Sequence, residues 1–165
     1  MKKINGLLAA LVMLASAGTA FAADDMYGEV GYLAFKFKDS DGGSVKPKDL
    51  RFVVGKELNS NLAAELIGAI NVKKDEDYSA NTFGVYLKPK ATVVQDLDVF
   101  ARVGVARTTL KYPNGYSGHV TKAAYGVGAQ YQLTKDVYGQ VDYMHYGKDN
   151  GVTARGFTIS VGTRF

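Results

Sequence analysis

The sequence predicts an all-β protein: an eight-stranded antiparallel up-and-down transmembrane β-barrel, preceded by a cleaved signal peptide. Three observations support this prediction. The chain begins with two lysines and an uncharged stretch, its remainder alternates apolar and polar residues with a period of two, and the breaks between the alternating stretches differ in length in a regular order. Its 165 residues suffice for one domain with a sizeable core, but hardly for two.

The first element is an export signal. Two lysines follow Met1, an apolar segment extends to Leu14, and small residues then lead to Ala20-Phe21-Ala22. A short positive region, an apolar core and an A-x-A site are typical of a secretory signal peptide. We expect cleavage after Ala22, which gives a signal peptide of residues 1–22 and a barrel domain of residues 23–165. An uncleaved anchor is the alternative, because 20 uncharged residues can just span a bilayer, but the small residues of the last third disfavour it.

Composition excludes several classes of function. Cleavage removes two of the 20 Lys and Arg residues and none of the 16 Asp and Glu residues, so the net charge falls from +4 to +2. This bias is too weak to predict a nucleic-acid partner. The absence of cysteine excludes a disulfide scaffold, a thiolate metal site and a cysteine nucleophile. Because the chain has only two histidines, we expect no transition-metal site and no cofactor.

The strands come next. After residue 23 there is no apolar run near the length of a spanning helix and no sustained helical stripe. The alternating stretches are residues 26–38, 50–58, 62–74, 82–93, 98–112, 120–133, 137–148 and 152–165. Tight breaks at 59–61, 95–97 and 134–136 are interleaved with breaks at 39–49, 75–81, 113–119 and 149–151, most of them longer.

Short turns at one end and longer loops at the other are the pattern of a bacterial outer-membrane barrel, in which the short turns lie in the periplasm. An even number of strands then places both termini in the periplasm.

The charges on the apolar phase of the strands support this assignment. They are Lys36, Lys56, Arg107 and Arg155, and each lies near a strand end. A basic side chain on the lipid face costs roughly 0 to 1 kcal/mol near the interface, but about 2 to 4 kcal/mol at the bilayer midplane. A soluble β-domain has no reason to follow this depth rule. Tyr and Phe residues near the strand ends are suited to the interfacial aromatic girdles.

The opposite phase carries polar residues and many glycines, and is expected to line the interior. Eight strands leave a lumen just wide enough for side chains to fill, so we expect no open pore. Charges removed from water must pair and form hydrogen bonds. We therefore predict a lumen salt-bridge network of Glu29, Glu57, Glu65, Lys88, Lys90, Arg102, Asp142 and Arg164. Such a network either fills the interior with paired polar groups, which we favour, or forms a gated proton or ion path.

Two stretches fit the pattern poorly. Residues 32–35 are apolar on both faces, so the phase of the first strand is ambiguous and a β-bulge is a candidate explanation. Pro89 lies within the fourth strand, where a closed barrel offers no free edge for a residue without an N–H donor. We expect an irregularity or an early end of pairing there.

The end of the chain carries the most specific resemblance. Residues 156–165, GFTISVGTRF, resemble the C-terminal strand signature of outer-membrane proteins that the barrel-assembly machinery recognises. The residues of this assembly signal are Phe157, Ile159, Val161 and Phe165. Upstream, residues 125–147 resemble the penultimate hairpin of the OmpA-like and OmpX-like eight-stranded barrel family, with Asp142 in the position of its seventh-strand acid. Residues 98–110, including Gly104, are similar to the fifth strand of that family.

The resemblance implies an integral outer-membrane barrel, and it says little about activity. We expect a monomer with a structural or envelope-interaction role and no catalytic site, whose partners are outer-membrane lipid and lipopolysaccharide and, during biogenesis, the barrel-assembly machinery. We expect no peptidoglycan-binding domain after Phe165. A lipid A modifying enzyme and a narrow channel are the alternatives. A surface adhesin or serum-resistance protein is a further one, against which the short loops argue.

Candidate chemistry is sparse. The lipid A deacylase family would require a His-x-Ser-Asn element, but His145-Tyr146-Gly147 has Gly in place of Ser. Residues 39–43, DSDGG, lack the closing Glu of a calcium loop, and His119 is a single loop histidine. Basic residues gather near the expected outer rim, where lipopolysaccharide presents phosphates, although acids dilute them. They are Lys36, Lys38, Lys46, Lys48, Lys73, Lys74, Arg107, Lys111, Lys122, Lys148 and Arg155.

Overall fold

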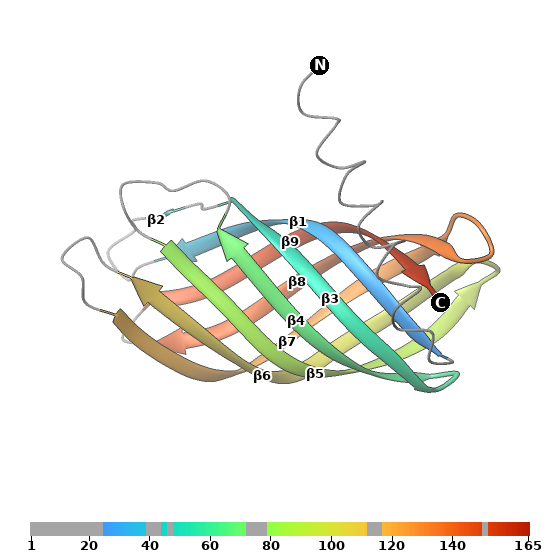
Figure 1. The fold of residues 1–165 in the computed structure, drawn as a ribbon, viewed down its shortest axis with the longest axis horizontal. Coiled ribbons are helices and arrows are strands. Elements are labelled where there is room, and N and C mark those ends of the chain that lie inside the picture. The colour runs from blue at the N-terminus through green and yellow to red at the C-terminus, as the bar shows by residue number, and fades with distance from the viewer. Residues whose placement is uncertain (1–24, 39–43, 46–47, 72–78, 112–116, 150–151) are drawn as a thin grey trace, which may run out of the picture.

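The computed structural model describes residues 25–38, 44–45, 48–71, 79–111, 117–149 and 152–165 (Figure 1). The expected signal peptide and the DSDGG segment lie outside these residues. The strands are β1 (Met26–Lys38), β2 (Ser44–Val45), β3 (Lys48–Asn59), β4 (Leu62–Asn71), β5 (Ser79–Val94), β6 (Leu97–Lys111), β7 (Ser117–Gln132), β8 (Val137–Asp149) and β9 (Val152–Arg164). Within the described residues, no helix is long and apolar enough to cross a membrane.

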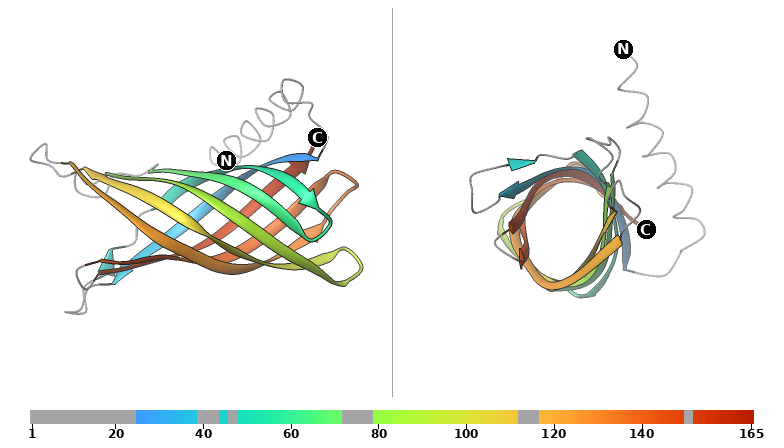
Figure 2. Two further views of the ribbon diagram at one scale, coloured as in Figure 1. Left: turned by 90° about the horizontal axis from the view of Figure 1, so that it is seen from below. Right: turned by 90° about the vertical axis from the view of Figure 1, so that its left-hand side faces the viewer.

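The eight long strands form a closed antiparallel barrel, as predicted. Each pairs with its neighbours in the chain, and β1 also pairs with β9, which closes the ring seen along the barrel axis in Figure 2. The short β2 pairs with the end of β1 and adds nothing to the ring. Closure leaves no long unpaired edge, so backbone N–H and C=O groups are satisfied within the sheet, as a bilayer requires.

The connections define two ends of the barrel. The end with the three tight connections β3–β4, β5–β6 and β7–β8 is called the turn end here, and the opposite end is called the loop end (Figures 1 and 2). The chain enters β1 and leaves β9 at the turn end, where the Phe165 N–H donates to the Met26 carbonyl at 2.9 Å. In the tight β5–β6 turn Asp96 adopts φ +66°, a left-handed conformation that Asp tolerates.

The predicted strand limits are confirmed to within three residues wherever both are described. The largest differences are at the loop end, where β5 begins at Ser79 instead of 82 and β7 at Ser117 instead of 120. The added residues, 79–81 and 117–119, are mostly polar or small, so they do not continue the apolar alternation. They nevertheless pair with β6, because ladder hydrogen bonds continue beyond the apolar part of a strand.

The bulge suggested for the first strand is wrong. The ladders of β1 with β3 and with β9 run through residues 32–34 without a register shift. Tyr32 and Ala34 are exposed outside, whereas Leu33 is fully buried inside. The inner phase is apolar here because Leu33 joins an interior hydrophobic cluster with Ala69, Tyr86 and other residues.

Pro89 interrupts the sheet locally, as expected, but does not end it. The β5–β6 ladder has no bridge at Lys88 or Pro89 and resumes in the same register at Lys90, which pairs with Phe100. A register shift follows between Thr92 and Val94. On the β4 side, the Lys90 N–H donates to the Asn61 carbonyl at 2.8 Å. Strand β5 therefore continues beyond a residue that has no N–H donor.

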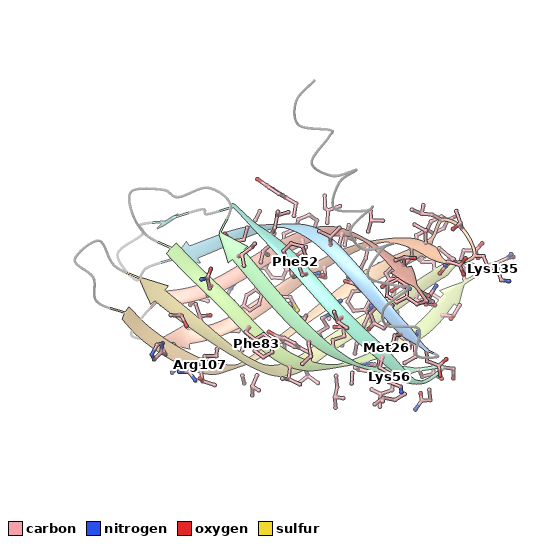
Figure 3. The ribbon with its side chains drawn as sticks, viewed as in Figure 1. Met26, Phe52, Lys56, Phe83, Arg107 and Lys135 are labelled. Atoms are coloured by element: carbon pink, nitrogen blue, oxygen red, sulfur yellow. The ribbon has the colours of Figure 1, made fainter. Side chains whose placement is uncertain are left out.

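The outer wall of the barrel is apolar, whereas the interior holds charged and polar residues beside an apolar cluster. Phe52 and Phe83 project from the middle of the outer wall, while Lys56 lies towards the turn end and Arg107 towards the loop end (Figure 3). Charged side chains thus flank an apolar band, which is the depth pattern that a bilayer imposes. Inside, Glu29, Arg102 and other charged residues are almost completely buried.

Candidate functional site

Six ionisable side chains meet inside the barrel, and we call them the buried charge cluster. They are Glu29 on β1, Arg51 on β3, Glu65 on β4, Lys88 on β5, Arg102 on β6 and Asp142 on β8. Three are acids and three are bases, and each side chain is at most 3% exposed. Buried charges are tolerated only when they are paired and hydrogen-bonded, and this balanced set meets that condition.

Arg102 is the centre of the cluster. Its Nε donates to Glu65 Oε2 at 2.5 Å and its Nη1 to Asp142 Oδ2 at 2.7 Å. Its Nη2 donates to Glu65 Oε1 at 3.0 Å and to Glu29 Oε2 at 3.2 Å. One guanidinium therefore joins carboxylates from three strands, β1, β4 and β8, and ties together walls of the barrel that are not neighbours in the sheet.

Arg51 provides a second link to Asp142. Its Nη1 donates to Asp142 Oδ1 at 2.8 Å, and its Nη2 pairs with Oδ2. Strands β1 and β9 separate β3 from β8, and at the register of Arg51 they contribute the small residues Gly31 and Ser160. A Cβ added to Gly31 would lie 2.7 Å from the Ser160 Cβ. Small residues thus leave room for the long Arg51 side chain to reach β8.

Lys88 occupies the turn-end side of the cluster. Its Nζ donates to Gln140 Oε1 at 2.8 Å, to Gln130 Oε1 at 3.1 Å and to Glu29 Oε1 at 3.3 Å. Glu65 Oε1 lies 3.5 Å from the same nitrogen. Three aromatic rings surround the ammonium group, with centroids at 4.5 Å (Phe100), 5.2 Å (Tyr27) and 5.8 Å (Tyr138). Carboxylates, amides and ring faces together replace the water shell of this cation.

Each of these three rings lies against an inward glycine. A Cβ built on Gly55 would overlap the ring of Tyr27, one on Gly128 that of Phe100, and one on Gly162 that of Tyr138. The glycines therefore let the rings pack against the barrel wall around Lys88. This explains part of the glycine content of the inner phase.

Neutral groups complete the hydrogen bonding of the acids. Tyr27 Oη donates to Glu65 Oε1 at 2.7 Å, and Tyr138 Oη donates to Glu29 Oε1 at 3.0 Å. Gln140 Nε2 donates to Glu29 Oε2 at 3.0 Å. Hydrogen bonds to charged acceptors are the strong ones, so these neutral donors help to fix the carboxylates in position.

The structure brings together five of the eight residues that the sequence assigned to the network: Glu29, Glu65, Lys88, Arg102 and Asp142. Glu57 and Lys90 form a separate ion pair at 2.6 Å, with side chains 19% and 12% exposed. Arg164 forms no ion pair with any residue that the structure describes. It donates to Gln132 Oε1 at 2.6 Å, and its guanidinium carbon lies 4.9 Å from the ring centroid of Tyr138.

Arg51 was missed by the sequence reasoning. Arg51 lies on the inner face of β3, but nearer the loop end than the other charges. Its position along the strand therefore gave no reason to group it with them. The small residues Gly31 and Ser160 on the neighbouring strands at its level are the signal that would have identified it.

Residues 7–165 match the family described as the outer membrane protein beta-barrel domain. The chain belongs to this family. The match covers almost the whole sequence, and it agrees with the closed barrel, the apolar outer wall and the polar interior. No curated protein sequence matches the chain.

Solved barrels of low identity share the fold. Neisserial surface protein A is 21% identical, with 86% of this chain and 98% of that chain covered and a TM-score of 0.66. Ail, the attachment invasion locus protein of Yersinia pestis, is 16% identical, with coverage of 85% and 97% and the same TM-score of 0.66. The N-terminal β-barrel domain of Pseudomonas aeruginosa OprF is 16% identical, with coverage of 81% and 96% and a TM-score of 0.55.

The other candidate residues lie apart from the cluster. His145 is on the outer phase of β8, and its ring centroid lies 5.0 Å from that of Tyr125. His119 is exposed on β7. Within the described residues, no group of three or more His, Cys, Asp or Glu side chains is placed to hold a metal ion.

The assembly-signal residues lie on β9 and at the terminus that follows it. Phe157, Ile159 and Phe165 are exposed on the outer wall, and Val161 is partly exposed. Among the basic residues assigned to the rim, Arg107 and Arg155 are exposed on the outer wall, whereas Lys122 is partly buried next to Gly147. Lys46, Lys73 and Lys74 lie outside the described residues.

Proposed function

We propose that this protein is a small structural barrel of the outer membrane, with a closed interior, no catalytic site and a role in the organisation of the envelope. The observation that carries the proposal is the position of Arg102, whose guanidinium joins Glu29, Glu65 and Asp142 from three strands with no solvent exposure. A water-filled path would separate these groups, because hydrated charges gain little from direct pairing.

Layers on both sides of the cluster support a closed lumen. Towards the turn end lie the rings of Tyr27, Phe100 and Tyr138, which are at most 5% exposed. Towards the loop end lie Leu33 and Met144, both fully buried. The cluster is therefore an internal scaffold between two packed layers, and its role is to hold the walls together.

Flux through the barrel tests this proposal. The purified protein is reconstituted into vesicles that contain a pH-sensitive dye, and a pH gradient is applied. We expect the same rate of dye response as in vesicles without protein. A faster rate in proportion to the amount of folded barrel would favour a narrow proton or ion path. Mass spectrometry of lipid A from cells with and without the protein tests the enzyme alternative, for which we expect unchanged lipid A.

Contact with the lipids of the outer leaflet is the second part of the proposed role. Arg107 and Arg155 are exposed on the outer wall at the loop end, where anionic headgroups would neutralise them. Ail has been crystallised with the heparin analogue sucrose octasulfate, which gives a precedent for anion binding by a barrel of this fold. The proposal extends this precedent to anionic groups at the membrane surface.

The orientation and biogenesis of the barrel complete the proposal. A signal peptide of residues 1–22 would be removed on export, and both termini and the tight turns would face the periplasm. The exposed apolar side chains of Phe157, Ile159 and Phe165 support recognition of the last strand by the barrel-assembly machinery. The closed sheet supports a monomer, because β1 and β9 pair with each other and leave no edge for a second copy.

A further inference from the structure

A notch interrupts the apolar outer wall at Gly68. This glycine faces outwards on β4, opposite Phe52 on β3 and opposite Phe83 on β5. A Cβ added to Gly68 would meet no atom within 4 Å, whereas Phe52 and Phe83 are 41% and 55% exposed. The two phenyl rings therefore stand on either side of an empty strand position, and together they form a slot for an apolar chain.

The slot opens into a shallow depression of about 330 Å³ that extends from β4 across β5 to β6. Its outward-facing side chains are apolar on the β4 side, with Gly68 and Ile70, and polar on the β6 side, with Arg107 and Thr109. Phe83 and Asn81 lie between them on β5. The depression is thus amphipathic, with an apolar region and a cationic region side by side.

Arg107 is the cation of this depression. It lies opposite Phe83 in the β5–β6 ladder and is exposed on the outer wall towards the loop end (Figure 3). Its side chain forms no hydrogen bond or ion pair with any residue that the structure describes. A basic side chain on a lipid-facing wall is best satisfied by an anionic headgroup at the membrane surface. We therefore expect the partner of Arg107 to be an anionic lipid headgroup.

We propose that the depression is a binding site for a phosphorylated, acylated glycolipid of the lipid A type. One acyl chain lies in the Gly68 slot between Phe52 and Phe83, and a phosphate binds Arg107. The inference deepens the proposed function and rests on its orientation, because the loop end then faces the leaflet that contains lipopolysaccharide. A second copy of the chain fits less well, since a symmetric contact would bring two Arg107 side chains together.

Native mass spectrometry of the folded mature protein in detergent tests the site. The probe is hexa-acylated bisphosphorylated lipid A, compared with lipid A without phosphates, with the bisphosphorylated disaccharide without acyl chains, and with phosphatidylglycerol. We expect one tightly bound lipid A per barrel. Each of the other three probes should bind at least about tenfold more weakly, because each lacks the phosphate, the chains or the sugar that joins them.

Two variants test the two halves of the site. Gly68→Leu fills the slot from a position where an added Cβ meets no atom within 4 Å, and Arg107→Gln removes the charge. Each should weaken binding of lipid A by about tenfold. Gly139→Leu and Lys56→Gln are matched controls. Gly139 is an outward glycine near the turn end, where an added Cβ has its nearest contact at 3.7 Å from Leu133, and Lys56 is an exposed outward lysine of β3 towards the same end. Both controls should bind lipid A as the wild type does.

Three results would overturn the proposal: wild-type binding by both test variants, equal loss in Lys56→Gln, or equal binding of phosphatidylglycerol. If the wild type forms dimers that Gly68→Leu abolishes, and the wild type does not bind lipid A, the depression is a contact between copies of the chain. The gel mobility of unboiled samples confirms that each variant is folded. Failure of the site leaves the closed-lumen proposal intact, because vesicle flux measures that property separately.

Discussion

Arg51 on β3 and Asp142 on β8 form a bidentate ion pair inside the barrel, although β1 and β9 lie between their strands in the sheet. Asp142 also accepts a hydrogen bond from Arg102 at 2.7 Å, so one carboxylate connects two guanidiniums. Strand order alone does not bring these residues together. The contact exists because the lumen is narrow and the residues between them are small.

Truncation of Arg51 should destabilise the barrel strongly. Arg51→Ala leaves the cluster with three acids and two bases in a closed interior, and the loss of one partner of a buried ion pair costs about 3 to 5 kcal/mol. Urea unfolding of the protein in vesicles measures the free energy of unfolding. Arg155→Ala, which removes an exposed arginine from the outer wall, is the control and should change this free energy by less than about 1 kcal/mol.

Replacement of both partners should cost less than replacement of one. The double variant Arg51→Met with Asp142→Leu leaves Arg102 and Lys88 opposite Glu29 and Glu65, so the charges remain balanced. We expect it to unfold at a higher urea concentration than Arg51→Ala. A double variant that is less stable than the single variant would show that Asp142 contributes chiefly through partners other than Arg51.

The glycines beneath the aromatic rings provide a matched pair of substitutions. In Gly128→Ala the new methyl group would overlap the ring of Phe100 and displace it from Lys88, whereas Gly68→Ala meets no atom within 4 Å. Both changes replace glycine with alanine in a strand, so their backbone effects are similar. We expect Gly128→Ala to lower the free energy of unfolding by about 1 to 3 kcal/mol relative to Gly68→Ala. Equal stabilities would contradict the close packing described here.

Cysteine labelling distinguishes the two faces of β6. Val103 is 55% exposed outside, whereas Ala106 is 2% exposed inside. A lipid-soluble thiol reagent should label Val103→Cys in vesicles and leave Ala106→Cys unreacted. Gly104 is a poorer inner position for this test, because an added Cβ would overlap the Val85 carbonyl. Labelling of both cysteines in the folded protein would argue against the assigned phase.

The last residue should matter more for assembly in cells than for folding in detergent. Phe165→Ala removes the terminal aromatic residue of the proposed assembly signal, and the amount of folded barrel in the outer membrane should decrease several-fold. Refolding of the purified variant into detergent should remain efficient. Val127→Ala, which truncates an exposed side chain on the outer wall of β7, is the control and should assemble normally.

The sequence predicted the fold well because a barrel follows from local pattern. Period-two alternation identifies the strands and their faces, and the order of tight and long breaks gives the topology. The first strand was the exception, since Leu33 is an apolar residue on the inner phase, which the sequence pattern predicts to be polar. Its neighbours on other strands, which make that level of the lumen apolar, are not visible in the local pattern.

The partners inside the lumen were harder to predict. Long side chains reach across several strands, so their contacts depend on the register of every ladder between them. Strand position shows how deep a residue lies in the lumen, but not which side chains reach across it. The sequence therefore grouped Glu57, Lys90 and Arg164 with the cluster and left out Arg51.

Planar-bilayer recording tests the closed interior most directly. The wild-type barrel should give no stable, reproducible current, because the buried charge cluster ties the walls together across the lumen. The double variant Arg51→Ala with Arg102→Ala removes the two guanidiniums that bridge the strands, and it should give discrete conductance steps provided that its gel mobility shows a folded barrel. Stable conductance steps from the wild-type protein would contradict the account.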